Sequence, residues 1–153
     1  MFSLDGLKTT LDDAHSWFLH ELVFADELRL VLAQGIAASE PEDITIGEHV
    51  ISGTRALEPR ATSQIVVVTF ARVVAWQRID ESFTALDDYD ERDDTSFIQI
   101  LSRSHYLDYI RAHHGWFEDR MPTAKLYRVW TENDVIDVVS PDAPRIEPRN
   151  AAI

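Results

Sequence analysis

The chain has 153 residues and contains no cysteine. This absence excludes disulfides, thiolate metal ligands, iron–sulfur clusters and a cysteine nucleophile. Glycine is scarce as well, and its five positions are too far apart to form a glycine-rich phosphate loop. The longest apolar run, from Ile65 to Ala71, is interrupted by a threonine. It is far shorter than the roughly 20 residues of a membrane-spanning helix, so we expect no membrane insertion.

Basic residues are also scarce. The sequence has 14 Lys and Arg against 27 Asp and Glu, which gives a formal net charge of −13 at pH 7. Such a field repels the phosphates of nucleic acids, so binding to nucleic acid is disfavoured. It favours a basic protein as the partner, although solubility alone also explains an acidic surface.

The length is that of one domain with a sizeable core. We predict a single globular domain over residues 1–140. Three prolines follow within residues 141–153, and they predict an extended tail without regular structure. The segment from Met1 to Gly6 lacks the basic residues of a signal peptide, so we expect a cytoplasmic protein.

Apolar residues recur at spacings of three and four near the N-terminus, and Ser3 stands where a helix cap would be. This pattern predicts an amphipathic helix over residues 3–16. A second, short helix is predicted over residues 104–112, with Ser104 as its cap and a buried stripe behind it.

The remaining pattern is that of strands. Residues 17–24 and 28–33 flank a short polar turn and predict a hairpin, although a helix across residues 19–34 also fits the apolar spacing. A turn-rich connector over residues 35–43 precedes further predicted strands, which lie near residues 44–57, 64–71, 73–80 and 97–101.

The clearest hairpin signal joins residues 125–131 to residues 134–139. The two residues between them are Glu132 and Asn133, and asparagine tolerates the positive φ that many two-residue turns need. Because crossover helices are missing, the strands should pair antiparallel. The sequence therefore predicts an α+β, mainly β fold, built as a curled sheet, an open barrel or a sandwich.

A histidine-rich segment lies at the predicted end of the second helix. Two imidazoles and a carboxylate are a frequent zinc or iron ligand set. Gly115 weakens this hypothesis, because it favours a helix end at which histidines interact with the negative dipole. No complete ligand motif is present, so the structural interpretation is favoured. The candidate metal ligands are His105, His113, His114 and Glu118.

Acidic residues gather between residues 87 and 94, with six acids and one base. Counted from Asp88, the sixth residue is Asp93 and the twelfth is Gln99, so the glycine and glutamate of an EF-hand loop are missing. The run is therefore predicted to be a solvated, mobile loop.

The four tryptophans and four tyrosines are candidates for the wall of a ligand pocket, although packing in the core explains most of them. Trp116 and Phe117 follow a glycine, and we expect this pair to be exposed enough to anchor a partner.

The segments from Ser104 to Ile110, from Leu126 to Val129 and from Ile136 to Ser140 resemble a family of small uncharacterised bacterial proteins. This resemblance covers less than a third of the chain and implies only a single-domain, bacterial, cytosolic protein. In size and charge the chain also resembles immunity proteins, which neutralise toxins.

No complete catalytic motif is present, and no G-x-S-x-G elbow occurs, so no catalytic residue and no cofactor are predicted. The leading hypothesis is a non-enzymatic, inhibitor-like module that binds a basic protein. A small metal-dependent or acid–base hydrolase that uses the His105, His113 and His114 region and a small-molecule carrier with an aromatic pocket are the alternatives. The sequence indicates no oligomeric state. The predicted contact residues are Asp87, Asp88, Asp90, Glu91, Asp93, Asp94, Trp116 and Phe117.

Overall fold

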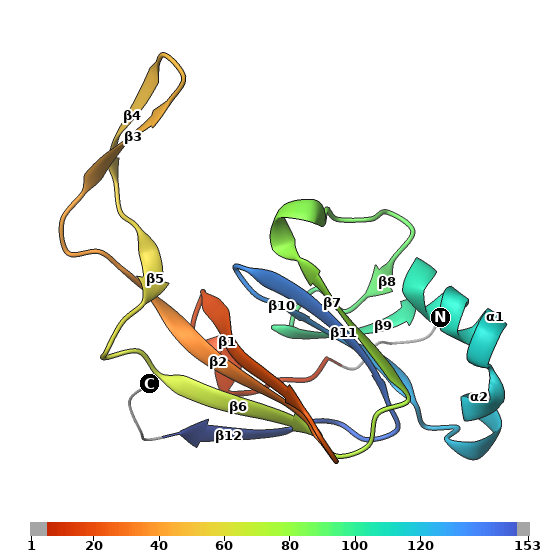
Figure 1. Ribbon diagram of the computed structural model, residues 1–153. Coiled ribbons are helices and arrows are strands. Elements are labelled where there is room, and N and C mark those ends of the chain that lie inside the picture. Colours follow the sequence, from red (N-terminus) through yellow and green to blue (C-terminus); the bar gives the residue numbers. More distant parts are fainter. Residues whose placement is uncertain (1–5, 150–153) are drawn as a thin grey trace.

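The computed structural model describes residues 6–149 and consists mainly of antiparallel strands (Figure 1). The first sheet has the order β1-β2-β6-β12, with β5 also paired to β2. Its strands are β1 (Trp17–Phe24), β2 (Leu28–Ala37), β5 (Leu57–Pro59), β6 (Ile65–Phe70) and β12 (Arg145–Arg149).

The second sheet has the order β7-β11-β10-β9-β8. Its strands are β7 (Ala75–Asp80), β8 (Glu91–Arg92), β9 (Ile98–Arg103), β10 (Lys125–Trp130) and β11 (Asp134–Ser140). The separate two-stranded ribbon consists of β3 (Glu42–Ile46) and β4 (His49–Thr54). The helices are α1 (His105–His114) and α2 (Trp116–Arg120), with 3-10 turns at Thr10–Asp13 and Glu81–Phe83. The predicted α+β, mainly β, antiparallel fold is confirmed, and the sheets are not closed into a barrel.

The main core lies between the two five-stranded sheets. Side chains alternate along each strand, so every second residue faces the opposite sheet. Leu30 and Val68 from the first sheet pack with Val129 and Ile136 from the second, and all four are fully buried. The opposite faces of the same strands point outward, and one of them positions the candidate site.

Part of the outer face of the second sheet is covered by the helices. Leu107, Ile110 and Phe117 pack on Leu126 and Val139 and form a second apolar cluster. Figure 1 shows α1 and α2 at one end of this sheet, so these helices cover only part of its outer face.

The prediction of an N-terminal helix over residues 3–16 is wrong for the part that the structure describes, and residues 3–5 lie outside it. Only a 3-10 turn forms, over Thr10–Asp13. The Asp12 carboxylate explains this, because it accepts from the backbone N–H of Thr9 at 2.8 Å and from that of Phe97 at 2.7 Å. These bonds tie one short turn to the second sheet instead of extending a helix.

The hairpin prediction at the start of the chain is confirmed, and the competing helix does not form. β1 pairs antiparallel with β2, and β2 pairs in turn with β6. Leu28, Leu30 and Leu32 all have zero exposure. Their period of two matches the sheet, which overrides the good helix propensity of leucine.

The strand predicted near residues 44–57 is three strands. β2 continues to Ala37, into the predicted connector, and residues 42–54 form the ribbon, with β5 after it. Gly47 has φ of +62°, the left-handed region that glycine enters without strain, and it reverses the chain between Ile46 and His49.

The predicted extended tail is wrong for residues 145–149, which form β12 at the edge of the first sheet. Pro148 is tolerated there because an edge strand can lack one N–H donor. Ile146 packs against the main core, so this segment belongs to the domain. Residues 150–153 of the predicted tail lie outside the described part of the chain.

The hairpin at Glu132 and Asn133 is confirmed, but Asn133 does not adopt positive φ. Its side chain bonds to the first sheet instead. The Leu19 N–H donates to Asn133 Oδ1 at 2.8 Å, and Asn133 Nδ2 donates to the Leu19 carbonyl at 3.0 Å. Asn133 therefore joins the two sheets at this corner.

Candidate functional site

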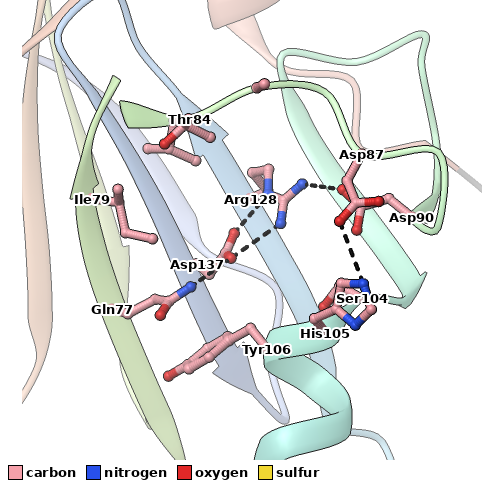
Figure 2. Close-up of a pocket in the computed structure, with 12 residues that line it drawn as sticks. Gln77, Ile79, Thr84, Asp87, Asp90, Ser104, His105, Tyr106, Arg128 and Asp137 are labelled. Atoms are coloured by element: carbon pink, nitrogen blue, oxygen red, sulfur yellow. Dashed lines mark hydrogen bonds and ion pairs between the residues drawn. The ribbon is translucent and has the colours of Figure 1, made fainter. Parts of the chain in front are cut away.

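A pocket of about 180 Å³ lies on the outer face of the second sheet, beside the region that the helices cover (Figure 2). Its floor consists of outward side chains from three neighbouring strands: Gln77 and Ile79 on β7, Arg128 on β10, and Val135 and Asp137 on β11. Its walls are the start of α1 and the segment from Thr84 to Asp90.

Arg128 lies at the centre of the floor. Its Nε donates to Asp137 Oδ1 at 2.8 Å and its Nη2 to Asp137 Oδ2 at 3.1 Å, while its Nη1 donates to Asp90 Oδ2 at 2.6 Å. Gln77 Nε2 also donates to Asp137, at 3.2 Å. All three guanidinium nitrogens therefore have carboxylate partners, as Figure 2 shows.

The charge of Arg128 is neutralised within the fold. Burial by itself would lower the pKa of Arg128, but the hydrogen bonds and charges of Asp137 and Asp90 raise it overall. Three carboxylates line the pocket, those of Asp87, Asp90 and Asp137, against one guanidinium. The pocket is therefore electronegative and fits a cationic group better than an anion.

The wall that carries Asp87 and Asp90 is held against α1 by Tyr89. The Tyr89 ring stacks on His105 with centroids 4.2 Å apart, and the Arg103 guanidinium lies 4.8 Å from its centroid on the ring face. The Tyr89 hydroxyl donates to Asp108, and this bond raises the pKa of Tyr89. Asp87 lies 3.5 Å from His105 Nε2.

The remaining wall is the first turn of α1. Ser104 is the predicted N-cap, and its hydroxyl accepts from the Leu107 N–H at 3.0 Å, which confirms that prediction. The helix extends two residues beyond the predicted end, to His114. Burial, together with the negative charge of Asp137, raises the pKa of Tyr106 to about 12, so its phenol is neutral at physiological pH.

Gly115 does not end the first helix in a left-handed conformation. It has φ of −62° and joins α1 directly to α2. A Cβ at this position would lie 2.6 Å from the Arg111 carbonyl oxygen, so the junction is too tight for a side chain.

The predicted acidic residues divide into two groups. Asp87, Asp88, Glu91 and Asp94 are exposed. The carboxylates of Asp90 and Asp93 are buried, so the prediction of an entirely solvated run is wrong for these two. Asp90 pairs with Arg128, while Asp93 accepts from the backbone N–H of Thr95 at 2.9 Å and from its hydroxyl at 2.7 Å.

The aromatic pair predicted to anchor a partner is divided as well. Trp116 is 78% exposed, as expected, but Phe117 is buried under α2 against the second sheet. The pair follows a helical junction, and successive residues of a helix point in different directions. Phe117 is therefore a packing residue.

The predicted metal ligands are not brought together. His105 lies in the first turn of α1 and contacts Asp87, whereas His113 and His114 lie about 12 Å further along the helix axis. Glu118 is paired with Arg111 at 3.1 Å. Within residues 6–149, no group of three acidic or histidine side chains is close enough to hold a metal ion.

The tryptophans do not line this pocket either. Trp17 is buried in the main core, and Trp76 packs on Phe24 with centroids 6.1 Å apart. Tyr106 and His105 are the aromatic side chains in the pocket wall. Most of its lining residues have polar side chains, in contrast to the aromatic cavity that a carrier would need.

Three residues of the site were missed in the sequence: Arg128, Asp137 and Gln77. A signal for two of them exists, because Arg128 and Asp137 are equally distant from the Glu132–Asn133 turn and are paired in the hairpin register. Residues directly opposite each other share a face, so the predicted hairpin already implied this ion pair. Gln77 gave no comparable signal.

In the part of the chain that the structure describes, no helix is long and apolar enough to cross a membrane. Comparison with protein-family models, with curated proteins and with solved structures finds no match.

Proposed function

We propose that this chain is a non-enzymatic binding module that engages a basic protein partner, in the manner of an inhibitor or immunity protein. The contact surface would be the acidic face, defined as the exposed carboxylates of Asp87, Asp88, Glu91 and Asp94 together with the pocket beside them. A lysine or arginine side chain of the partner would enter the pocket.

The observation that carries this proposal is the charge of the pocket. Arg128 is the single guanidinium in its lining, and all of its nitrogens bond to Asp137 and Asp90. A volume of about 180 Å³ is below the roughly 300 Å³ at which pockets for drug-sized ligands begin, so one long side chain fits better than a cofactor. Basic anchors in small pockets are frequent hot spots of protein interfaces.

Exposed apolar side chains beside the pocket support a protein partner. Phe83 is 86% exposed and Leu86 is 69% exposed, and both flank the lining residues Thr84 and Ala85. Ile79 lies in the pocket itself and is 39% exposed. An apolar ring around a charged anchor excludes water from the contact, which strengthens the central ion pair.

The experiment compares two variants that each lose three carboxylates. The probe is a capped peptide of alternating arginine and glycine, and its affinity is measured by fluorescence anisotropy at low and high salt. D87N/D88N/D94N should weaken binding about tenfold, and high salt should weaken wild-type binding strongly. D13N/E21Q/D26N, which removes exposed acids elsewhere, should change affinity by about twofold or less.

Equal losses in the two variants would show that the net charge binds the peptide without a defined site, and the proposal would then be wrong. Wild-type affinity that does not depend on salt would also contradict it.

A further inference from the structure

A second surface of the molecule has no role in the proposed binding by the acidic face. The arm, defined as β3 and β4 with their turn over residues 42–54, stands away from both sheets in Figure 1. All side chains of its two strands are exposed except that of Thr54, which is half-buried. An isolated two-stranded ribbon is marginally stable in water, so this arrangement is typical of an element that packs on something else.

One side of the arm is apolar. Ile44 pairs directly with Ile51, and Ile46 pairs with His49, so these side chains share one face. The three isoleucines are 47%, 48% and 62% exposed for Ile44, Ile51 and Ile46. We call them the isoleucine face. Val50, which pairs with Thr45, lies on the opposite face.

The base of the arm is fixed to the domain. The Arg55 guanidinium donates to the carbonyls of Ser39 at 2.6 Å and of Ala38 at 3.0 Å, and the Ala38 N–H donates to the Ala56 carbonyl at 2.8 Å. These bonds hold the two chain ends of the arm together. The isoleucine face therefore lies on a ribbon whose base is fixed to the rest of the molecule.

The charges around this face indicate what covers it. Residues 40–54 contain four acids and no lysine or arginine. A second copy of the chain would bring these carboxylates against an identical set, and two chains of net charge −13 repel each other. A partner with an apolar groove and basic borders is complementary to both features. The four acids are Glu40, Glu42, Asp43 and Glu48.

We propose that the arm is a docking element whose isoleucine face inserts into an apolar groove bordered by lysine or arginine on a partner protein. This contact needs no contribution from the pocket, because the arm projects from the first sheet beyond β2 and β5, whereas the pocket is lined by residues of the second sheet, of α1 and of the segment from Thr84 to Asp90. It is therefore independent of the proposed function of the acidic face.

The test uses a short amphipathic helical peptide of leucine and lysine as the probe, because its leucine stripe is bordered by lysines. I44T/I46T/I51T removes the apolar face but keeps β-branched residues, which suit strands. We expect this variant to bind the peptide at least about tenfold more weakly than wild type. The matched control V50T, on the opposite face, should remain within about twofold of wild type, and a peptide with glutamate in place of lysine should not bind.

Three outcomes would overturn the proposal. In the first, I44T/I46T/I51T binds the peptide as wild type does, which would leave the arm without a role. If D87N/D88N/D94N alone removes binding, the peptide binds to the acidic face instead of the arm, and the proposed function keeps its support. In the second, the glutamate peptide binds as tightly as the lysine peptide. In the third, sedimentation velocity shows a dimer of the wild type that I44T/I46T/I51T dissociates, which would assign the isoleucine face to a second copy.

Discussion

At the scale of single residues, Arg128 determines the character of the pocket. Its neighbours in the strand, Tyr127 and Val129, point into the main core, so Arg128 must point to the outer face. There its side chain is 11% exposed and lies between Asp137 and Asp90. A charge this buried is tolerated because every nitrogen bonds to a carboxylate.

Replacement of Arg128 by methionine keeps most of the aliphatic part of the side chain. It leaves Asp137 buried without its counter-ion and leaves Asp90 with only the more distant guanidinium of Arg92, at 4.0 Å. We expect a loss of about 3 kcal/mol or more in the free energy of unfolding, measured by urea titration. The exposed pair of Arg111 and Glu118 provides the control, and R111A should lose about 0.5 kcal/mol or less. Equal effects of the two substitutions would show that the buried ion pairs are unimportant for stability.

The raised pKa of Tyr106 predicts a change in stability at alkaline pH. Its pKa is raised from 10.0 to about 12 by burial and by Asp137, so the folded protein favours the neutral phenol. The contribution of Tyr106 to the free energy of unfolding should therefore be constant below about pH 10 and should fall as the pH rises from there towards 12. Y106F should make this fall less steep, as measured by urea midpoints across that range. An identical fall in Y106F and wild type would contradict the assignment.

At the scale of elements, the corner between the two sheets depends on Asn133. N133A removes both side-chain hydrogen bonds to Leu19, as well as the bond that Asn133 Oδ1 accepts from the Thr131 hydroxyl, and it leaves the backbone N–H and carbonyl of Leu19 without these partners. We expect a loss of about 2 kcal/mol in the free energy of unfolding. N133D keeps the acceptor and loses the donor, so its urea midpoint should lie between those of wild type and N133A. No loss in N133A would mean that water replaces the amide without a penalty.

Elements with a period of two were predictable, because burial of alternate residues leaves a mark in the sequence. The hairpins that became β1–β2 and β10–β11 are examples. The N-terminal segment was wrongly predicted to be a helix because Leu7 and Leu11, which contact the core, have helical spacing. Its conformation is instead fixed by the hydrogen bond that Asp12 accepts from Phe97, which lies far along the sequence. Such long-range bonds leave no periodic signal.

The candidate site was only partly predictable for the same reason. The acid run located one wall, and Ser104 located the start of α1. The inward turn of Asp90 and Asp93 depends on Arg128 and on local turn bonds, so composition alone could not separate them from their exposed neighbours. The pairing of Arg128 with Asp137 was contained in the hairpin register.

At the scale of the whole molecule, the arm and the domain should be separable. In Figure 1 the arm projects away from both sheets, and the bonds of Arg55 close the chain below it. Replacement of residues 42–54 by an Asn-Gly turn should therefore leave the urea midpoint nearly unchanged. Removal of β12, whose Ile146 packs on the main core, is the contrasting deletion and should lower the midpoint clearly. A large loss on removal of the arm would show that the domain depends on it.

Exposed acidic residues occur on many segments of the chain, so the proposed function requires that a cation be bound at one place. The most direct measurement is an NMR titration of the ¹⁵N-labelled protein with capped arginine amide, with capped norleucine amide as the control. We expect saturable shifts for arginine at residues around the pocket, such as Gln77, Asp87 and His105, and none for norleucine. Small unsaturable shifts spread over all acidic residues, or no shifts at the pocket, would contradict the proposed function.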